Sequence, residues 1–152
     1  MKCFLFCLFF PLLTFSQEAP KGTNLIKVKG VSFKEVAETL LDQGYTFMKI
    51  DSNFNTITTD PKDNSRRTSG MIQINIRVKD SVAFITGYCG WTAGDFTDNP
   101  GYTGDKLLDV ALGGKGEIRN VGMKRSILKD SFGAIDKFAK SLGGKIEYVV
   151  NK

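Results

Sequence analysis

The chain of 152 residues contains no histidine, and this absence limits the chemistry that its side chains can perform. It excludes Ser-His-Asp and Cys-His catalytic couples, histidine-ligated zinc and any imidazole acid or base. A hydrolase would then need a cysteine activated by a neighbouring cation, or a pair of carboxylates. No spacing in the sequence indicates a carboxylate pair. We therefore expect a binding protein rather than an enzyme, with a hydrolase as the least favoured class.

Cysteine occurs three times, but only Cys89 lies beyond the first sixteen residues. Two interpretations of its role stay open. Cys89 could be a nucleophile, a redox sensor or the link of a dimer, if a Lys, an Arg or a helix N-terminus lowered its pKa. The favoured interpretation is a small buried apolar residue at the end of a strand, which is the usual state of a free cysteine.

The segment Gly90–Gly104 combines aromatic, acidic and amide side chains and is the candidate ligand-binding site. Long loops without secondary structure are uncommon in compact domains and are usually functional or disordered. Aromatic rings can stack on a sugar or close on a peptide, while Asp and Asn side chains supply directional hydrogen bonds. In the alternative interpretation, Trp91 packs on the sheet edge and the remainder is a solvated turn. The candidate ligand-binding residues are Trp91, Asp95, Phe96, Asp98, Asn99 and Tyr102.

Metal, phosphate and nucleic-acid chemistry are weakly indicated. Asp95, Asp98 and Asp105 do not have the spacing of an EF-hand, so calcium is a minor alternative and no metal or cofactor is expected. The sequence Gly113-Gly114-Lys115-Gly116 lacks the first glycine and the hydroxyl residue of a phosphate-binding loop, and it predicts a turn. The formal net charge is +5, but the basic residues are dispersed, so nucleic-acid binding is not expected. A weak, salt-sensitive attraction to an anionic surface is compatible with that charge.

The first sixteen residues have the pattern of a secretory signal peptide. Lys2 precedes an apolar run, and Ser16 provides a small residue before Gln17. The run is interrupted by Pro11 and is shorter than the roughly 20 residues that span a bilayer. We therefore expect a signal peptide over residues 1–16, export to the periplasm or beyond the cell, and no membrane-spanning segment.

The rest of the chain has the length of one domain. Residues 17–23 are polar, contain Pro and Gly, and predict a flexible tether, whereas residues 24–152 predict a single α+β domain. Ser32 and Glu35 form a capping box that predicts the start of an amphipathic helix, and Gly44 is suited to end it. The predicted buried stripe of this helix consists of Phe33, Val36, Ala37, Leu40 and Leu41.

A second amphipathic helix is predicted over residues 124–142, and alternation of apolar and polar residues predicts strands elsewhere. Two helices are too few to cover both faces of a parallel sheet. The fold class is therefore α+β, an antiparallel sheet of about five to six strands with two helices packed on one face. The predicted strands comprise residues 24–28, 45–50, 56–59, 71–78, 81–89 and 145–150.

The strand at residues 71–78 shows the clearest alternation and predicts one buried face and one solvent-exposed face. Its apolar face consists of Ile72, Ile74, Ile76 and Val78, and its polar face of Gln73, Asn75 and Arg77. Two registers stay open for the strand that follows Lys79-Asp80. A two-residue turn places Ala83, Ile85, Gly87 and Cys89 beside the apolar face, and a three-residue turn places Val82, Phe84, Thr86 and Tyr88 there.

Two stretches of the chain resemble a known fold. The first runs from Val31-Ser32-Phe33-Lys34-Glu35-Val36 through Leu40-Leu41, Gly44-Tyr45 and Asp51 to Ile57-Thr58-Thr59, and the second comprises Met123-Lys124-Arg125-Ser126 with Phe132, Asp136, Phe138 and Ala139. Together they resemble the helix-grip (TATA-binding-protein-like) domain of small exported bacterial proteins of unknown function, which also occurs in an outer-membrane assembly lipoprotein. This chain lacks the lipid-bearing cysteine of that lipoprotein and adds the segment Gly90–Gly104. The resemblance implies a helix-grip fold and assigns no catalytic residue.

These observations predict a small exported binding module whose partner is a peptide, a glycan or an envelope protein. Its site would combine Gly90–Gly104 with an exposed sheet edge. The alternative is an inhibitor or envelope-stress protein that uses its whole sheet face, including Gln73, Asn75 and Arg77. The sequence predicts neither the identity of the partner nor the oligomeric state.

Overall fold

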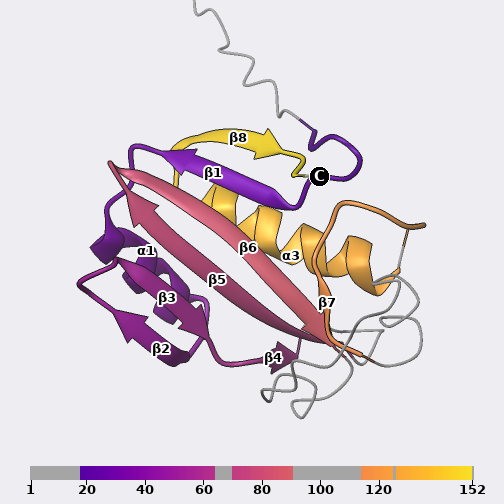
Figure 1. The fold of residues 1–152 in the computed structure, drawn as a ribbon, viewed down its shortest axis with the longest axis horizontal. Helices are drawn as coiled ribbons and strands as arrows, with labels where there is room; N and C mark the ends of the chain where they lie inside the picture. Colours follow the sequence, from indigo (N-terminus) through magenta and orange to yellow (C-terminus); the bar gives the residue numbers. More distant parts are fainter. Residues whose placement is uncertain (1–17, 64–69, 91–113, 125, 152) are drawn as a thin grey trace, which may run out of the picture.

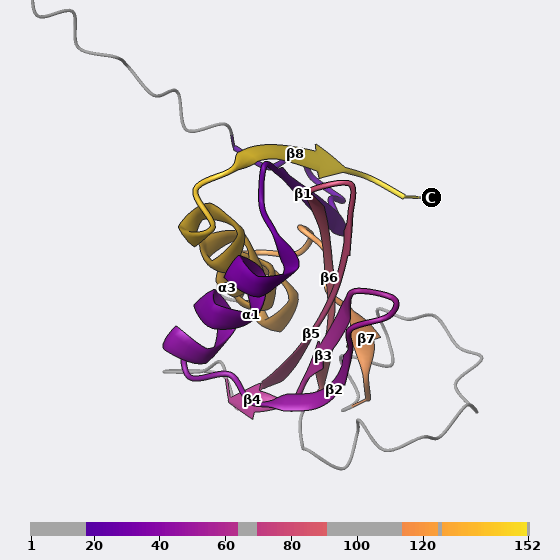
Figure 2. The same cartoon turned by 90° about the vertical axis from the view of Figure 1, so that its left-hand side faces the viewer.

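The computed structural model describes residues 18–63, 70–90, 114–124 and 126–151, which form an antiparallel sheet and two helices (Figure 1). Both helices pack on one face of the sheet, and no described helix covers the other face, called the open face below (Figure 2). The predicted α+β fold class is therefore confirmed. The elements are β1 (Leu25–Lys29), α1 (Phe33–Asp42), β2 (Phe47–Asp51), β3 (Thr56–Thr59), β4 (Lys62–Asp63), β5 (Met71–Lys79), β6 (Val82–Gly90), β7 (Gly116–Glu117), α3 (Ile127–Ser141) and β8 (Lys145–Val149).

The strands follow the order β2-β3-β5-β6-β1-β8, and every pair is antiparallel. Two short strands lie off this path, because β4 pairs with β5 and β7 pairs with β6. These two short strands explain why the described sheet has eight strands rather than the five to six expected. The first strand, β1, lies between β6 and the last strand, β8, so that β2 and β8 form the two edges of the described sheet (Figure 1).

The hairpin between β5 and β6 uses a two-residue turn, Asp80-Ser81. Both residues have positive φ, +52° and +57°, as a tight hairpin of the type I′ class requires. The register pairs Ile76 with Ile85 and Val78 with Ala83. Of the two registers left open by the sequence, the structure therefore has the one that directs Ala83, Ile85, Gly87 and Cys89 toward the helices.

The core lies between the sheet and the two helices. The alternation in β5 is confirmed, because its four predicted apolar residues are all buried. Leu41 is a correction, since it is half exposed although it was predicted to belong to the buried stripe of α1. Successive helix residues are about 100° apart, and Leu40 already occupies the centre of the buried face. The largest fully buried apolar side chains are Phe138, Ile26, Leu40, Ile57, Ile72, Ile74, Ile85, Ile118, Val28 and Val36.

The helix ends follow the local sequence closely. The capping box is present: the Glu35 N–H donates to Ser32 Oγ (3.2 Å), and the Ser32 N–H donates to Glu35 Oε2 (2.7 Å). The hydrogen bonds that the Ser32 N–H and the Ser32 hydroxyl (2.8 Å) donate to Glu35 Oε2 lower the pKa of the Glu35 carboxyl. Gly44 has φ of +73° just after α1, as predicted. The second helix begins later than expected, at Ile127, because Ser126 caps it.

The described part of the predicted tether, residues 17–23, is fixed to the rest of the chain. Asn120 is the centre of this contact: its Nδ2 donates to the Ala19 carbonyl (2.7 Å), and its carbonyl accepts from the Gly22 N–H (2.9 Å). The Asn120 N–H in turn donates to the Thr23 carbonyl (2.7 Å), and Thr23 is fully buried. Residues 18–23, part of the predicted tether, therefore hydrogen-bond through their backbone to a segment about 100 positions away in sequence.

Candidate functional site

The six candidate ligand-binding residues, Trp91, Asp95, Phe96, Asp98, Asn99 and Tyr102, lie outside the described residues. The residues that flank them are described. β6 ends at Gly90, and β7 returns to pair with β6 at Cys89 and Tyr88. Both attachment points of the intervening segment therefore lie at the same end of the sheet, beside the open-face residues Tyr88 and Gln73.

Side chains from six strands form a cross-strand row on the open face. The strand register places these residues directly opposite one another, and every second residue of a strand faces the same side. Near the centre of the row the Lys27 ammonium lies 5.9 Å from the centroid of the Phe84 ring. In order across the sheet, the row consists of Asp51, Thr56, Arg77, Phe84, Lys27 and Glu147.

A second row runs parallel to the first and is uncharged over most of its length. Lys49 lies opposite Thr58, Thr58 opposite Asn75, and Asn75 opposite Thr86. The Thr86 hydroxyl donates to the backbone carbonyl of Asn75 (3.4 Å). Hydroxyl and amide groups in a line can hydrogen-bond to a peptide backbone or to sugar hydroxyls.

The third row contains a second pair of an aromatic ring and a lysine. Tyr88 lies opposite Gln73, and the Lys115 ammonium is 4.8 Å from the Tyr88 ring centroid and 3.4 Å from Gln73 Oε1. Gln73 was predicted on the solvent-exposed side of its strand, yet only 4% of it is exposed. This expectation was wrong because Lys115 and Met48 cover Gln73, whose Nε2 lies 3.5 Å from Met48 Sδ.

The open face carries an excess of basic groups. Glu147 is already paired, with Oε2 3.0 Å from Lys29 Nζ and Oε1 3.5 Å from Lys27 Nζ. The hydrogen bond from Lys29 is the main reason that the pKa of Glu147 is lowered, and the charge of Lys27 adds to the effect. Among the described residues, the basic ones on or beside this face are Lys27, Lys29, Lys49, Arg77, Lys79, Lys115, Arg119 and Lys145, and the acidic ones are Asp51, Asp63, Glu117 and Glu147.

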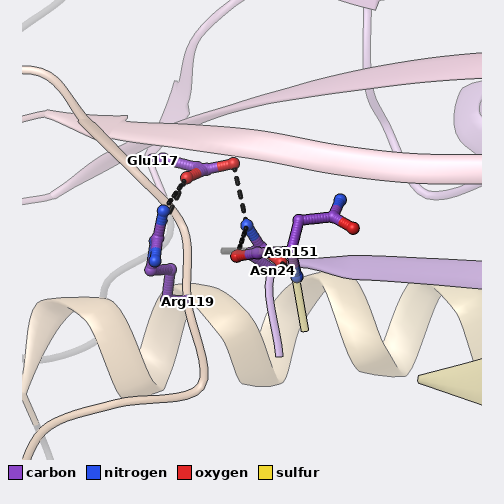
Figure 3. Close-up of polar contacts among 4 residues, drawn as sticks. All are labelled: Asn24, Glu117, Arg119 and Asn151. Atoms are coloured by element: carbon purple, nitrogen blue, oxygen red, sulfur yellow. Dashed lines mark hydrogen bonds and ion pairs between the residues drawn. The ribbon is translucent and has the colours of Figure 1, made fainter. Parts of the chain in front are cut away.

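A polar cluster beside this face joins both ends of the described chain to β7 (Figure 3). Asn24 is buried, and its Nδ2 donates to Glu117 Oε1 (3.2 Å) and to the Asn151 carbonyl (3.4 Å). Asn24 Oδ1 accepts from the Asn151 N–H (2.8 Å), and Arg119 donates to Glu117 Oε2 through Nε (3.1 Å) and Nη2 (2.7 Å). Each carboxylate oxygen of Glu117 has a partner, so the cluster links β7 to residues near both ends of the described chain.

Cys89 is fully buried on the helix-covered face of β6. Burial raises the pKa of its thiol to about 11, so that the reactive thiolate is scarce at neutral pH. A catalytic cysteine requires the opposite shift. The favoured interpretation of Cys89 as a small buried apolar residue agrees with this environment.

Two further features were searched for in the described part of the chain. No group of three or more Cys, Asp or Glu side chains within it could hold a metal ion. Neither of its helices is long and apolar enough to cross a membrane.

Comparison with known proteins yields no relative. No protein-family model matches the chain, and no curated protein and no solved structure is significantly similar to it. The resemblance to helix-grip proteins therefore stays a prediction from the sequence, and the function has to be argued from the geometry of the open face.

Proposed function

We propose that this protein is a small exported binding module that binds an acidic peptide, glycan or envelope protein on the open face of its sheet. The observation that carries the proposal is the arrangement around Thr86. Phe84 and Tyr88 lie two residues before and after it on the same face, and each ring is accompanied by a lysine. The face thus offers two aromatic-cationic positions about 13 Å apart, from the rise per strand residue, with polar groups between them.

This arrangement suits recognition rather than catalysis. Aromatic residues and arginine contribute strongly to binding surfaces, and Phe84 lies directly opposite Arg77. An excess of positive charge attracts a partner with acidic groups and increases its association rate at low salt. The segment Gly90–Gly104 stays a predicted part of the site, because it begins at the end of β6, two residues after Tyr88.

The test compares matched variants for binding to an array of acidic and neutral glycans and peptides and to immobilised envelope proteins. We expect Phe84→Ala/Tyr88→Ala to weaken binding at least tenfold. Arg77→Glu should also weaken binding relative to wild type, by a factor that increases as the salt concentration is lowered. Lys34→Glu is the control for Arg77→Glu, because Lys34 is an exposed lysine on α1, away from the open face.

The loop variant Trp91→Ala/Tyr102→Ala separates the two candidate sites. Binding that survives the loop variant and fails in Phe84→Ala/Tyr88→Ala supports the open face. The reverse result moves the site to the segment Gly90–Gly104. Absence of binding to every member of the array, by a protein that circular dichroism shows to be folded, contradicts the proposal.

A further inference from the structure

Exposed apolar side chains gather around the edge strand β2. Ile50 is 49% exposed and Met48 is 52% exposed on β2 itself, while Phe54 in the following turn is 70% exposed. No described strand lies on the outer side of β2 (Figure 1). An edge strand of this kind presents unpaired backbone groups that another strand can bind, and apolar side chains on it favour such pairing.

The hydrogen-bond pattern shows which backbone groups of β2 are free. The Val78 N–H donates to the Asn55 carbonyl (2.9 Å), which makes these two residues a hydrogen-bonded pair. Such pairs alternate with non-hydrogen-bonded pairs along an antiparallel ladder, so Ile57 also directs its N–H and C=O toward β5. Ile57 lies opposite Ile50. Ile50 therefore has no backbone hydrogen bond to β3, and its N–H and C=O point toward the free edge.

We propose that two copies of this chain pair through their β2 edges, antiparallel and centred on Ile50. A two-fold axis at this point lets Ile50 of each copy exchange both backbone hydrogen bonds with Ile50 of the other. The same register places Lys49 of each copy opposite Asp51 of the other, which makes two identical ion pairs on the open face. An interface of this kind is self-complementary, as two-fold symmetry requires.

The charged residues of β2 favour this register over the two registers that are shifted by one residue. A two-fold axis one residue earlier would place the two copies of Lys49 opposite each other, and an axis one residue later would oppose the two copies of Asp51. Like charges directly opposite each other in a sheet are destabilising, and opposite charges are stabilising. Only the register centred on Ile50 therefore combines apolar contact on one face with opposite charges on the other.

The side chains that this pairing requires are available. Asp51 Oδ1 accepts from the backbone N–H groups of Asn53 (3.0 Å) and Phe54 (3.2 Å), which fixes the orientation of the carboxylate. No ion pair joins Asp51 or Lys49 to another residue in the described part of the chain. The opposite edge, β8, has a similar order in Lys145-Ile146-Glu147, but Glu147 is paired within its own molecule. The β2 edge is therefore the one we assign to self-association.

Charge substitution tests the proposal by analytical ultracentrifugation of the full expressed protein over a range of concentrations. We expect a monomer–dimer equilibrium in the wild type and a dissociation constant at least tenfold higher for Lys49→Asp, which opposes two acidic residues. The double variant Lys49→Asp/Asp51→Lys exchanges the charges and should restore the dimer. Lys145→Asp, on the β8 edge, is the matched control and should leave the equilibrium unchanged.

Cysteine crosslinking tests the register independently of charge. Directly opposed residues of a hydrogen-bonded pair have Cα atoms about 5.5 Å apart, within disulfide range. Ile50→Cys should therefore yield a covalent dimer under mild oxidation by glutathione disulfide, whereas Ile146→Cys on β8 should yield little.

A wild-type protein that stays monomeric at every concentration overturns the proposal, including the case in which β2 instead binds an extended segment of another protein. So does a dimer that Lys49→Asp leaves intact or that Lys145→Asp breaks. Failure of the charge exchange to restore the dimer, together with failure of the Ile50→Cys crosslink in a folded protein, overturns the register.

Discussion

The helix-covered face and the open face of the sheet are made from alternate residues of the same strands, and their environments differ sharply. On β6, Ile85 is completely buried under the helices, whereas the next residue, Thr86, is half-buried on the open face. The helix-covered face is apolar and closely packed, and the open face is polar, basic and aromatic. The difference indicates that one face supplies most of the stability, while the other can carry a binding function with little effect on folding.

The largest expected effect comes from breaking the buried face at Ile85. Ile85→Ala removes a fully buried side chain and leaves a cavity beneath the helices. We expect a loss of about 2–5 kcal/mol in the free energy of unfolding, measured by urea denaturation. Thr86→Ala is the matched control from the open face and should cost less than about 1 kcal/mol. Equal losses for the two variants would contradict the division between the faces.

Ionisation of Cys89 provides a pH test of the same burial. Burial raises the pKa of its thiol to about 11 in the folded protein, from an ordinary value of 9.0. The folded state therefore holds its proton more tightly than the unfolded chain does. The resulting contribution to the free energy of unfolding is fully present below about pH 9 and is lost as pH rises through about 11. We expect wild type to lose about 2–3 kcal/mol more than Cys89→Ala over this range, measured by urea denaturation.

Thiol labelling supplies the control for this prediction. Native Cys89 should react with a thiol reagent at pH 8 at least 100-fold more slowly than the urea-unfolded chain, because about that factor separates their thiolate fractions. Tyr88→Cys in a Cys89→Ala background places a thiol on the open face and should react rapidly. Fast labelling of native Cys89 would show that the helix-covered face is accessible.

The close approach of α3 to β6 is tested at Gly87. A Cβ atom there would lie 2.5 Å from Ile135 Cδ1 and 2.9 Å from the Gln73 carbonyl oxygen. Gly87→Ala should therefore lower the free energy of unfolding by about 1–3 kcal/mol. Gly133→Ala is the matched control, because its Cβ would meet no atom within 4 Å and alanine favours the helix. It should stabilise by about 0.5–1 kcal/mol, and a thermal melt distinguishes the opposite signs.

The smallest effect on stability is expected from the aromatic residue at the centre of the open face. Phe84→Ala removes a half-buried ring that contacts the solvent-facing side chain of Lys27. We expect a loss of less than about 1 kcal/mol, together with a large loss of partner binding. A loss as large as that of Ile85→Ala would mean that the open face is part of the core.

The sequence predicted the elements whose signals are local. The capping box, the glycine after α1 and the alternation in β5 each depend on residues a few positions apart, and the structure confirms them. The apolar stripe of α3 was predicted for the same reason. The choice between the two hairpin registers was not, because it depends on whether Asp80 and Ser81 adopt positive φ, which their residue types allow but do not require.

Features that depend on distant residues were predicted poorly. The burial of Gln73 comes from Met48 and Lys115, which are far from it in sequence. The fixed position of the segment before β1 comes from Asn120. No pattern within either segment signals these contacts. The candidate ligand-binding segment Gly90–Gly104 stays a prediction, and the open-face rows became visible only when the register aligned side chains from six strands.

The position of β1 between β6 and β8 has a consequence for how the chain folds. Lys27 on β1 and Glu147 on β8 are 120 positions apart in sequence, yet they lie opposite each other in the sheet. Pairings of such high contact order form slowly, because a long loop must close before they can contribute. During synthesis, β1 cannot pair until β6 has been made, and its second edge stays unpaired until β8 has been made. A chain interrupted before β8 would therefore leave β1 as an open edge, prone to pair with another molecule.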